Sequence, residues 1–534
     1  MTGMPPINRR EMLALGLTGL AGLACRAGSA TPAAVGLIES GAARSPDFVP
    51  DVEVAFTAAP AEVPLLPGRP TGVLRYTANV IKGPPSTLDT LPESYLGPTL
   101  RLRRGQKVRI RFENRIAEES IMHWHGMDVP AAADGHPRLA IRAGQTYVYE
   151  FEVTNRAGTY WYHAHPDMLT GPQVYRGLAG LLVVSDEEED ALALPSGEQE
   201  LTCVLQDRRF DEGNQLVYSN AMMDRATGFL GDRVLVNGTP RPSWSLATRA
   251  YRIRVLNGSN ARVYKLAWSD GTPMTVIGTD GGLLDRPVTQ RYVTLAAAQR
   301  VDLWLDLSER PVGTTLELRS VAFEESDAAM VMMGGPGMEG GGMGMGRGMG
   351  RRGGRGNTLP LGIPITLLEM TVARRETASA RLPERLSTLE PAPQPATDAL
   401  ARRVPLTFQR MQWSFGGRVF DMDEVAADET VVAGSTRLWD LTNFGGGMGM
   451  QMAHPIHLHG RQFRVVSRSG GSPTNTLRDG LVDGGPLDTV LVLPDETVRI
   501  QVTFSSHPGL FLYHCHILEH EDMGMMRNFR IVPA

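Results

Sequence analysis

Residues 158–165 read GTYWYHAH, and residues 509–516 repeat the pattern as GLFLYHCH. A second pair of stretches repeats in the same order, HWHG at 123–126 and HLHG at 457–460. The aromatic and apolar run that leads into each His pair suits a strand. Because one copy of each repeat lies toward each end of the chain, we expect two related terminal domains.

Outward from these repeats, short runs of Val, Ile, Leu, Thr and Tyr alternate with clusters of Gly, Pro, Asn and Asp. Residues 97–102 and 107–112 alternate apolar and charged side chains, which predicts strands with one buried face and one solvent-exposed face. The pattern continues at 251–256 and 301–305, although no histidine lies between Pro166 and Ala453. We therefore expect a middle β domain without histidine ligands.

Length and composition agree with three β-rich domains. The chain has 534 residues, which allows roughly three domains of about 150 residues each. Hydrophobic residues make up 42% and charged residues 21%, and 59 Gly and 37 Pro supply the turns between many short elements. The formal net charge of -5 offers nothing to attract a polyanion, so nucleic acid is not an expected partner.

The N-terminus resembles a twin-arginine export signal. Arg9 and Arg10 precede an apolar run of small residues at 14–24, followed by Gly, Ser, Ala and Pro. This run is too short to span a bilayer, and no later segment reaches the ~20 apolar residues that a membrane helix needs. We expect cleavage of residues 1–30 and a periplasmic or otherwise exported protein without a membrane span. Lipidation at Cys25 is a minor alternative, since Gly22 stands where a lipidation signal favours Leu.

Two segments interrupt the strand pattern. Residues 330–356 are almost entirely Gly, Met and Arg, a composition that cannot bury a core, and residues 391–401 resemble a linker. The expected organisation is an export signal at 1–30 and domains at 46–186, 196–372 (with a Met- and Gly-rich insertion at 330–356) and 402–534.

Ten of the 12 histidines fall into four tight groups. Residues two apart on a strand point to the same face, so the two histidines of a His-x-His pair can bind a metal ion together. A single pair would more often be a hydrogen-bonded polar pair or part of a zinc site. Zinc sites use only three or four ligands, however, so ten histidines with a cysteine favour copper. The groups are His123/His125, His163/His165, His454/His457/His459 and His514/His516/His520.

The cysteine inside the last group indicates the kind of copper site. On a strand, Cys515 points away from its two flanking histidines, so it can bind one metal while they bind another. His520 and Met525 follow five and ten residues later, and His454 is available from another segment. These four residues form the ligand set of a blue copper electron-transfer centre. The remaining eight histidines come from both terminal domains and are expected to meet between them, where O2 could bind across several coppers.

The four groups together resemble the motifs of the multicopper oxidases, specifically the bacterial three-domain laccases and copper-efflux oxidases. The resemblance covers nearly the whole chain after the signal and implies an all-β fold of three cupredoxin-like Greek-key β-sandwich domains. It also implies four copper ions, one-electron oxidation of a substrate and reduction of O2 to water. By this resemblance the type 1 ligands are His454, Cys515, His520 and Met525, the type 2 ligands are His123 and His457, and the type 3 ligands are His125, His163, His165, His459, His514 and His516.

Two acidic residues stand close to these groups. Asp134 follows the first His pair, and Glu521 directly follows His520. Acids so placed in the family are thought to relay protons to reduced oxygen, which we expect for both, although each could instead be a solvated or hydrogen-bonding carboxylate. The remaining polar candidates are expected to be structural or exposed (His136 and His507) or a buried inert thiol (Cys203).

Methionines offer the only clue to the reducing substrate. Met450 and Met452 lie just before His454, and residues 330–356 add further thioethers, which are soft ligands that prefer Cu(I). We expect a cuprous oxidase that acts in copper tolerance, with these two methionines as candidate substrate ligands. Copper-efflux oxidases, however, carry their Met-rich insertion in the last domain and an Asp at the position of Met450. A general laccase acting on phenols or aromatic amines therefore stays open, and the insertion could be a disordered loop over the substrate cleft.

Two further alternatives belong to other classes of protein. The chain could be a periplasmic copper buffer with incidental turnover, or a relative that kept the fold and lost copper, which the intact ligand set argues against. A two-domain nitrite reductase is disfavoured because it would not need both the 163/165 and the 514/516 pairs. The expected partners are O2 and a small reducing substrate, and the protein is expected to be a monomer.

Overall fold

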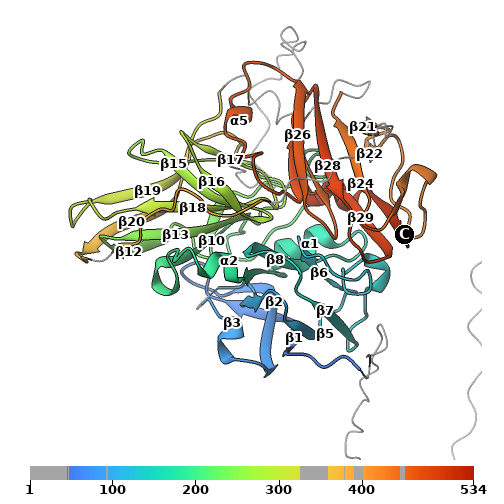
Figure 1. The fold of residues 1–534 in the computed structure, drawn as a ribbon, viewed down its shortest axis with the longest axis horizontal. Helices are drawn as coiled ribbons and strands as arrows, with labels where there is room; N and C mark the ends of the chain where they lie inside the picture. Colours follow the sequence, from blue (N-terminus) through green and yellow to red (C-terminus); the bar gives the residue numbers. More distant parts are fainter. Residues whose placement is uncertain are drawn as a thin grey trace, which may run out of the picture. The chain divides into compact units, whose positions relative to one another are not determined.

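The computed structural model describes residues 45, 47–91, 94–219, 221–324, 327, 359–377, 379–389, 401–444 and 452–534. The expected signal with Cys25, the insertion at 330–356 and Met450 lie outside these residues. Strands dominate the described chain, as Figure 1 shows. Among the described residues, no helix is long and apolar enough to cross a membrane.

The strands of residues 52–185 form two sheets around one core. Val54, Phe56 and Ala58 are fully buried on one face of the first strand, while the residues between them are half-buried. The chain crosses between the sheets several times, so sheet neighbours are often distant in sequence. One sheet has the order β2 (Thr71–Lys82), β1 (Val52–Val63), β5 (Lys107–Asn114), β7 (Thr146–Glu152), and the other β3 (Leu88–Asp89), β4 (Thr99–Arg103), β9 (Ala179–Ser185), β8 (Gly158–Ala164), β6 (Met122–His125).

The strands of residues 200–374 form a second pair of sheets. Their core is separate from the first and contains Ile253, Trp268 and Leu303. One sheet has the order β11 (Arg233–Val236), β10 (Glu200–Arg208), β13 (Ala250–Asn257), β18 (Arg300–Asp306), β15 (Met274–Thr279), β16 (Gly282–Gln290), and the other β12 (Ser243–Ala247), β20 (Ile365–Arg374), β19 (Thr315–Ser320), β14 (Tyr264–Trp268), β17 (Val293–Leu295).

The strands of residues 402–532 form the third pair, around a core that contains Trp413, Trp439 and Phe529. The sheets have the orders β22 (Gln412–Phe415), β21 (Arg402–Gln409), β24 (Thr436–Thr442), β28 (Glu496–Thr503), β26 (Phe463–Gly470) and β23 (Thr430–Val432), β30 (Met526–Val532), β29 (Gly509–Cys515), β25 (His454–Leu458), β27 (Thr489–Val492). The named α-helices are short: α1 (Thr170–Arg176), α2 (Glu187–Asp190), α3 (Met222–Thr227), α5 (Thr476–Asp479) and α6 (Leu518–Asp522).

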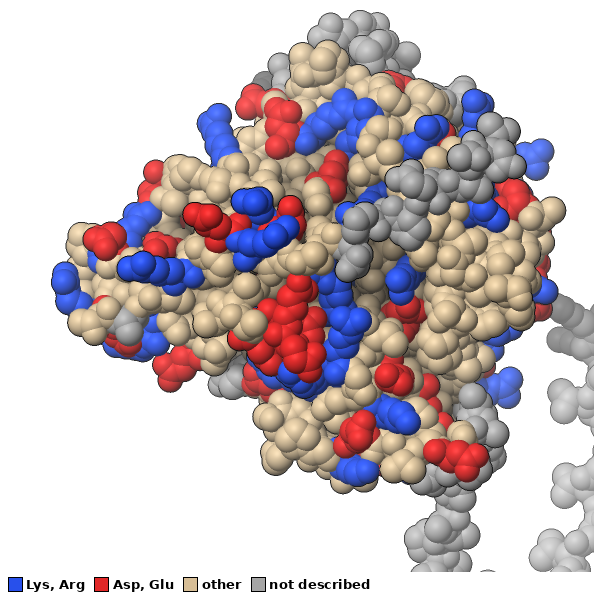
Figure 2. Space-filling model, viewed as in Figure 1, with Lys and Arg blue, Asp and Glu red and all other residues tan. Residues whose placement is uncertain are grey.

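The internal repeat of the sequence is a structural repeat. In the first sandwich β6 pairs antiparallel with β8, which sets His123 opposite His163. In the last sandwich β25 pairs antiparallel with β29, which sets His457 opposite His514. The expected all-β class of three β-sandwiches is confirmed, while the exact domain bounds stay predictions. On the face drawn in Figure 2, basic and acidic side chains lie intermingled rather than gathered into a basic field.

Candidate metal centres

The first group of metal-binding side chains lies at the C-terminal end of β29. The Cys515 sulfur lies 3.5 Å from His454 Nδ1 and 3.6 Å from His520 Nδ1, and all three side chains are buried. Cys515 pairs with Ile456 on β25, and His454, two residues earlier on β25, points to the same face of the sheet. Met525 is fully buried in the same core. We term His454, Cys515, His520 and Met525 the Cys515 cluster.

Aromatic and apolar groups surround the Cys515 cluster. The centre of the Trp413 ring lies 4.3 Å from that of His454 and 5.3 Å from that of His520. Burial lowers the pKa of His454 and lowers the pKa of His520 to about 3. The Nε2 atom of His520 lies 3.0 Å from the carbonyl oxygen of Ala226, to which it donates. Both imidazoles are therefore neutral, and His520 keeps its Nδ1 lone pair for a metal.

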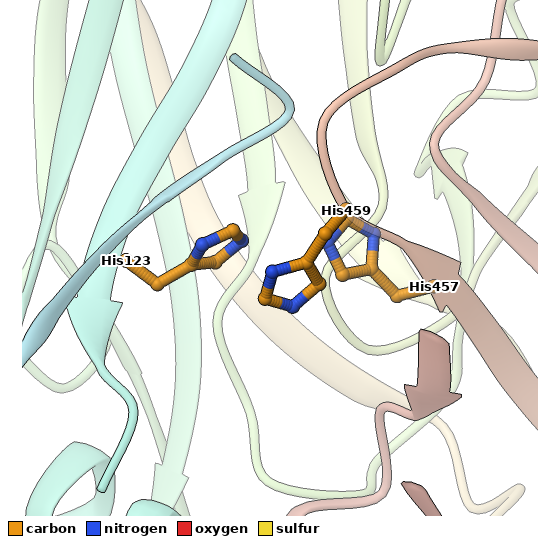
Figure 3. A group of neighbouring side chains, drawn as sticks. All are labelled: His123, His457 and His459. Atoms are coloured by element: carbon orange, nitrogen blue, oxygen red, sulfur yellow. The ribbon is translucent and has the colours of Figure 1, made fainter. Parts of the chain in front are cut away.

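The other eight predicted histidines form one buried group between the first and the last sandwich. They come from the ends of β6 and β8 on one side and of β25 and β29 on the other, and none is more than 1% exposed. Figure 3 shows that His123 points toward His457 and His459 from the opposite side. We term this group the histidine cluster: His123, His125, His163, His165, His457, His459, His514 and His516.

The imidazoles of the histidine cluster form one continuous group rather than separate sets. Ring centres lie 5.1–5.2 Å apart within His165/His459/His514 and 5.1–5.6 Å apart within His125/His163/His516. They approach more closely, to 3.8 Å and 3.6 Å, in the pairs His123/His459 and His125/His457. Ring nitrogens lie within 4.8 Å of one another in three sets: His123/His457/His459, His123/His125/His163 and His165/His459/His514.

Several ring nitrogens of the histidine cluster are buried without a hydrogen-bond partner. His123 Nδ1 donates to the carbonyl oxygen of Asp134 at 2.5 Å, and His457 Nδ1 donates to that of Asp488 at 2.8 Å. This tautomer leaves a lone pair on each Nε2, and within the described chain neither Nε2 atom has a partner, nor does either nitrogen of His516. A buried polar atom without a partner costs about 1–3 kcal/mol. A bound metal ion would remove that cost.

Two predicted carboxylates face the histidine cluster. Asp134 Oδ2 lies 2.8 Å from His459 Nδ1, and its Oδ1 lies 3.7 Å from His123 Nδ1 without a hydrogen-bond partner in the described chain. Burial raises the pKa of Asp134 well above its usual range. Glu521 lies 3.1 Å from His514 Nδ1 and 3.4 Å from His165 Nε2. Burial alone would raise the pKa of Glu521, but these two imidazoles outweigh it and lower the pKa to about 2.

A third carboxylate, Asp488, also contacts the cluster and was not predicted from the sequence. Its Oδ1 lies 3.0 Å from His125 Nε2. Arg300, from β18 of the middle sandwich, donates to both oxygens of Asp488 at 2.7 and 2.5 Å. Only the register between β25 and β27 could have pointed to Asp488, because this residue directly precedes Thr489, which lies opposite His457. The middle sandwich thus contributes to the site through an arginine rather than a histidine.

Comparison with known proteins identifies the family. Models described as "Multicopper oxidase" match residues 73–189 and 394–534. Multicopper oxidase mco of Staphylococcus haemolyticus is 29% identical over 436 residues, 82% of either chain, and bilirubin oxidase of Albifimbria verrucaria is 30% identical over 81% of this chain and 71% of its own. The crystal structure of McoA multicopper oxidase from Aquifex aeolicus is 32% identical, with a TM-score of 0.73 over 91% of this chain and 97% of that one. This chain belongs to the multicopper oxidase family.

The donor atoms of this multicopper oxidase fit the copper cofactors that its family implies. A thiol, two imidazoles and a thioether suit a copper that only transfers electrons, and a set of imidazoles suits coppers that bind O2. Burial lowers the pKa of His163 to about 3 and that of His165 to about 4, so these rings are neutral, as metal ligands must be. The two clusters are compatible with copper on chemistry as well as on spacing.

The other predicted residues of the multicopper oxidase lie as follows. Met452 is 4% exposed, and its carbonyl oxygen accepts from Asn443 Nδ2 at 2.8 Å. His136 is fully buried and its Nε2 bonds to Asn528 at 2.9 Å, while His507 is half-buried. Cys203 is buried with a free thiol, and burial raises its pKa to about 12, as expected for an inert cysteine.

Proposed function

We propose that this multicopper oxidase removes single electrons from a small reducing substrate at the Cys515 cluster and delivers four of them to O2 at the histidine cluster, forming water. The observation that carries the proposal is the alternation at the end of β29. Cys515 belongs to one cluster, and its neighbours His514 and His516 belong to the other. An electron therefore needs to cross only the covalent bonds between adjacent residues.

We propose that the two clusters hold four copper ions. When bound, copper supplies reversible one-electron transfer at the Cys515 cluster and O2 reduction at the histidine cluster. The sulfur–nitrogen distances, the convergence of ring nitrogens in the histidine cluster and the ring nitrogens without a hydrogen-bond partner support four copper ions. The proposed ligands are His454, Cys515, His520 and Met525 for type 1, His123 and His457 for type 2, and His125, His163, His165, His459, His514 and His516 for type 3.

We propose that Asp134 and Glu521 relay protons to the histidine cluster, because forming water from O2 consumes four protons. The raised pKa of Asp134 keeps a proton on its carboxyl group, and its unpartnered Oδ1 is a site from which that proton can leave. Glu521, between His514 and His165, is held ionised by its lowered pKa of about 2, so its carboxylate oxygens accept a proton only in passing it on. If the acids only orient imidazoles, replacing them will weaken copper binding without a separate effect on proton transfer.

We propose Cu(I) as the preferred donor, with phenols as further substrates. The thioethers of Met450 and Met452 before His454, and those of residues 330–356, support this, since they are soft ligands. The test is anaerobic addition of Cu(I), followed by O2 uptake, to copper-loaded protein and to a variant lacking 330–356, with a bulky phenol as comparison. We expect the deletion to lower the rate of Cu(I) oxidation strongly while leaving the rate of phenol oxidation unchanged or higher. Negligible Cu(I) oxidation, or indifference to the deletion, would make the protein a general laccase.

We propose a role in copper tolerance for this activity. Cells that carry the protein with His516→Ala should lose the tolerance that the unaltered protein gives, because O2 reduction stops. A growth curve in rising copper, with equal amounts of protein verified, measures this. Tolerance that largely persists would support a copper-buffering protein with incidental turnover instead.

We further propose export to the periplasm through the twin-arginine signal at 1–30, with cupredoxin-like domains at 46–186, 196–372 and 402–534. Replacing Arg9 and Arg10 by Lys should leave unprocessed protein in the cytoplasm, which cell fractionation detects. We also propose that the mature protein is a monomer, which light scattering tests.

A further inference from the structure

A long loop of the first sandwich reaches into the last one. It comprises residues 126–141, between β6 and β7, and we term it the crossing loop. Ala131 of this loop packs in the core of the last sandwich. A Cβ atom added to Gly509, the first residue of β29, would lie only 2.3 Å from that of Ala131, so the two segments are in close contact. The crossing loop is therefore held between the two sandwiches that share the histidine cluster.

Asp134, in the crossing loop, contacts one proposed copper ligand from each terminal sandwich. Its carbonyl oxygen accepts from His123 Nδ1 at 2.5 Å, and its Oδ2 accepts from His459 Nδ1 at 2.8 Å. Each contact keeps the ring proton on Nδ1 and leaves the lone pair of Nε2 for a metal ion. The two rings keep these orientations only if both the backbone and the side chain of Asp134 stay in place.

His136, two residues after Asp134, uses both nitrogens of its ring in hydrogen bonds. The ring is fully buried, and burial lowers its pKa to about 3, so the ring is neutral. Nδ1 accepts from the backbone N–H of Arg138 at 3.2 Å, so the ring proton lies on Nε2, which donates to Asn528 Oδ1 at 2.9 Å. Asn528, on β30, is also buried, and its Nδ2 donates to two carbonyl oxygens of its own sandwich, each at 2.9 Å. The bond from His136 to Asn528 therefore joins the two sandwiches through side chains that are both held in place.

The crossing loop has a second anchor, which lies farther from Asp134 along the chain. Asp128 accepts from Arg461 and Ser505 of the last sandwich, six residues before Asp134. His136 is the nearer anchor and lies on the other side of Asp134. An apolar side chain would fill the same space, but a hydrogen bond also fixes the direction in which the chain runs there. A buried histidine that is bonded across the interface therefore points to a role in positioning.

We propose that His136 is a positioning residue, which through its bond to Asn528 holds Asp134 against the histidine cluster. Asp134 in turn fixes the orientation of His123 and His459. The inference rests on the proposed function, because the orientation of these two rings matters only if they are copper ligands. Loss of the bond should weaken copper binding in the histidine cluster and leave the Cys515 cluster unchanged, since none of these residues belongs to the Cys515 cluster.

The test replaces His136 in the full chain by Leu and by Gln. His136→Leu has no polar side-chain atom, whereas His136→Gln can place an N–H group near the position of Nε2. The histidine cluster of His136→Leu should bind copper about 10-fold less tightly, as measured by the copper left after dialysis of loaded protein against a chelator, and His136→Gln should restore binding. The copper–thiolate absorption should stay the same in both variants. His507→Leu changes a histidine outside both clusters and should leave copper retention unchanged.

Two further measurements separate positioning from a role in folding. Asn528→Ala removes the acceptor without altering the crossing loop, so it should weaken copper binding as His136→Leu does. The two changes together should cost little more than either one alone, because both remove the same bond. In crystal structures of these variants, the distance between Asp134 Oδ2 and His459 Nδ1 should exceed about 3.5 Å, which is too long for a hydrogen bond.

The outcomes distinguish this proposal from the proposed function. A lower Tm with an unchanged Asp134–His459 distance and unchanged copper retention would overturn the positioning role, because His136 would then only support the fold. Equal loss of copper from both clusters would overturn it as well. A longer distance with unchanged copper retention would support the positioning role and contradict only the proposed copper ligands.

Discussion

The two buried clusters of this multicopper oxidase differ in what surrounds them. The Cys515 cluster lies inside the core of one sandwich, with Trp413 packed on its imidazoles. The histidine cluster lies between two sandwiches and has three carboxylates, Asp134, Glu521 and Asp488, against its rings. Transfer of an electron needs no proton carrier, whereas reduction of O2 to water consumes protons. Under the proposed function, the neighbours of the histidines distinguish the roles of the two clusters as much as the histidines themselves do.

The largest expected effect comes from removing the one residue that joins the clusters. Cys515→Ser should abolish both the intense visible absorption of a copper–thiolate bond and O2 uptake, with turnover falling more than roughly 100-fold. Cys203→Ser is the matched control, since both cysteines are buried but Cys203 is no part of either cluster. Absorption spectra and an oxygen electrode measure the two effects. Retention of the absorption in Cys515→Ser would show that the thiolate lies elsewhere.

The next effect separates the clusters. His516→Ala should lower O2 uptake more than roughly 100-fold while the copper–thiolate absorption persists. The reason is that the Cys515 sulfur and the imidazoles of His454 and His520 beside it are unchanged. Absorption and oxygen uptake on the same sample test this. Loss of both signals together would mean that the clusters do not fold or load independently.

A smaller effect tests the carboxylates. Glu521→Gln keeps the size of the side chain but removes the carboxylate that we propose relays protons, so O2 uptake should fall about 100-fold. Stopped-flow absorption should show that anaerobic reduction of the Cys515 cluster by a donor keeps its rate, since no proton is needed there. Equal slowing of both half-reactions would contradict the division between the two regions.

The smallest effect concerns the middle sandwich. Arg300→Lys keeps the buried positive charge but loses the paired contact with Asp488, so the histidine cluster should retain copper about 10-fold less tightly. Copper content after dialysis against a chelator measures this, and the thiolate absorption reports the Cys515 cluster separately. Equal loss of copper from both clusters would show that Arg300 supports the fold in general.

The sequence predicted those features of the candidate site that depend on local strand geometry. The two-residue period of a strand predicts that each His-x-His pair shares a face and that Cys515 points away from its neighbours, as the distances around its sulfur bear out. Asp488, Arg300 and Trp413 were missed because they reach the clusters by tertiary packing and lie in no recognisable pattern.

We propose that single electrons collected at the Cys515 cluster are delivered four at a time to O2, which is reduced to water. The most direct test measures how many molecules of a one-electron donor are oxidised for each O2 consumed by the copper-loaded protein, with hydrogen peroxide assayed in the same sample. We predict about four donors per O2 and no peroxide, because on the proposed function the histidine cluster completes the reduction. About two donors per O2 with matching peroxide, or donor oxidation without O2 uptake, would contradict it.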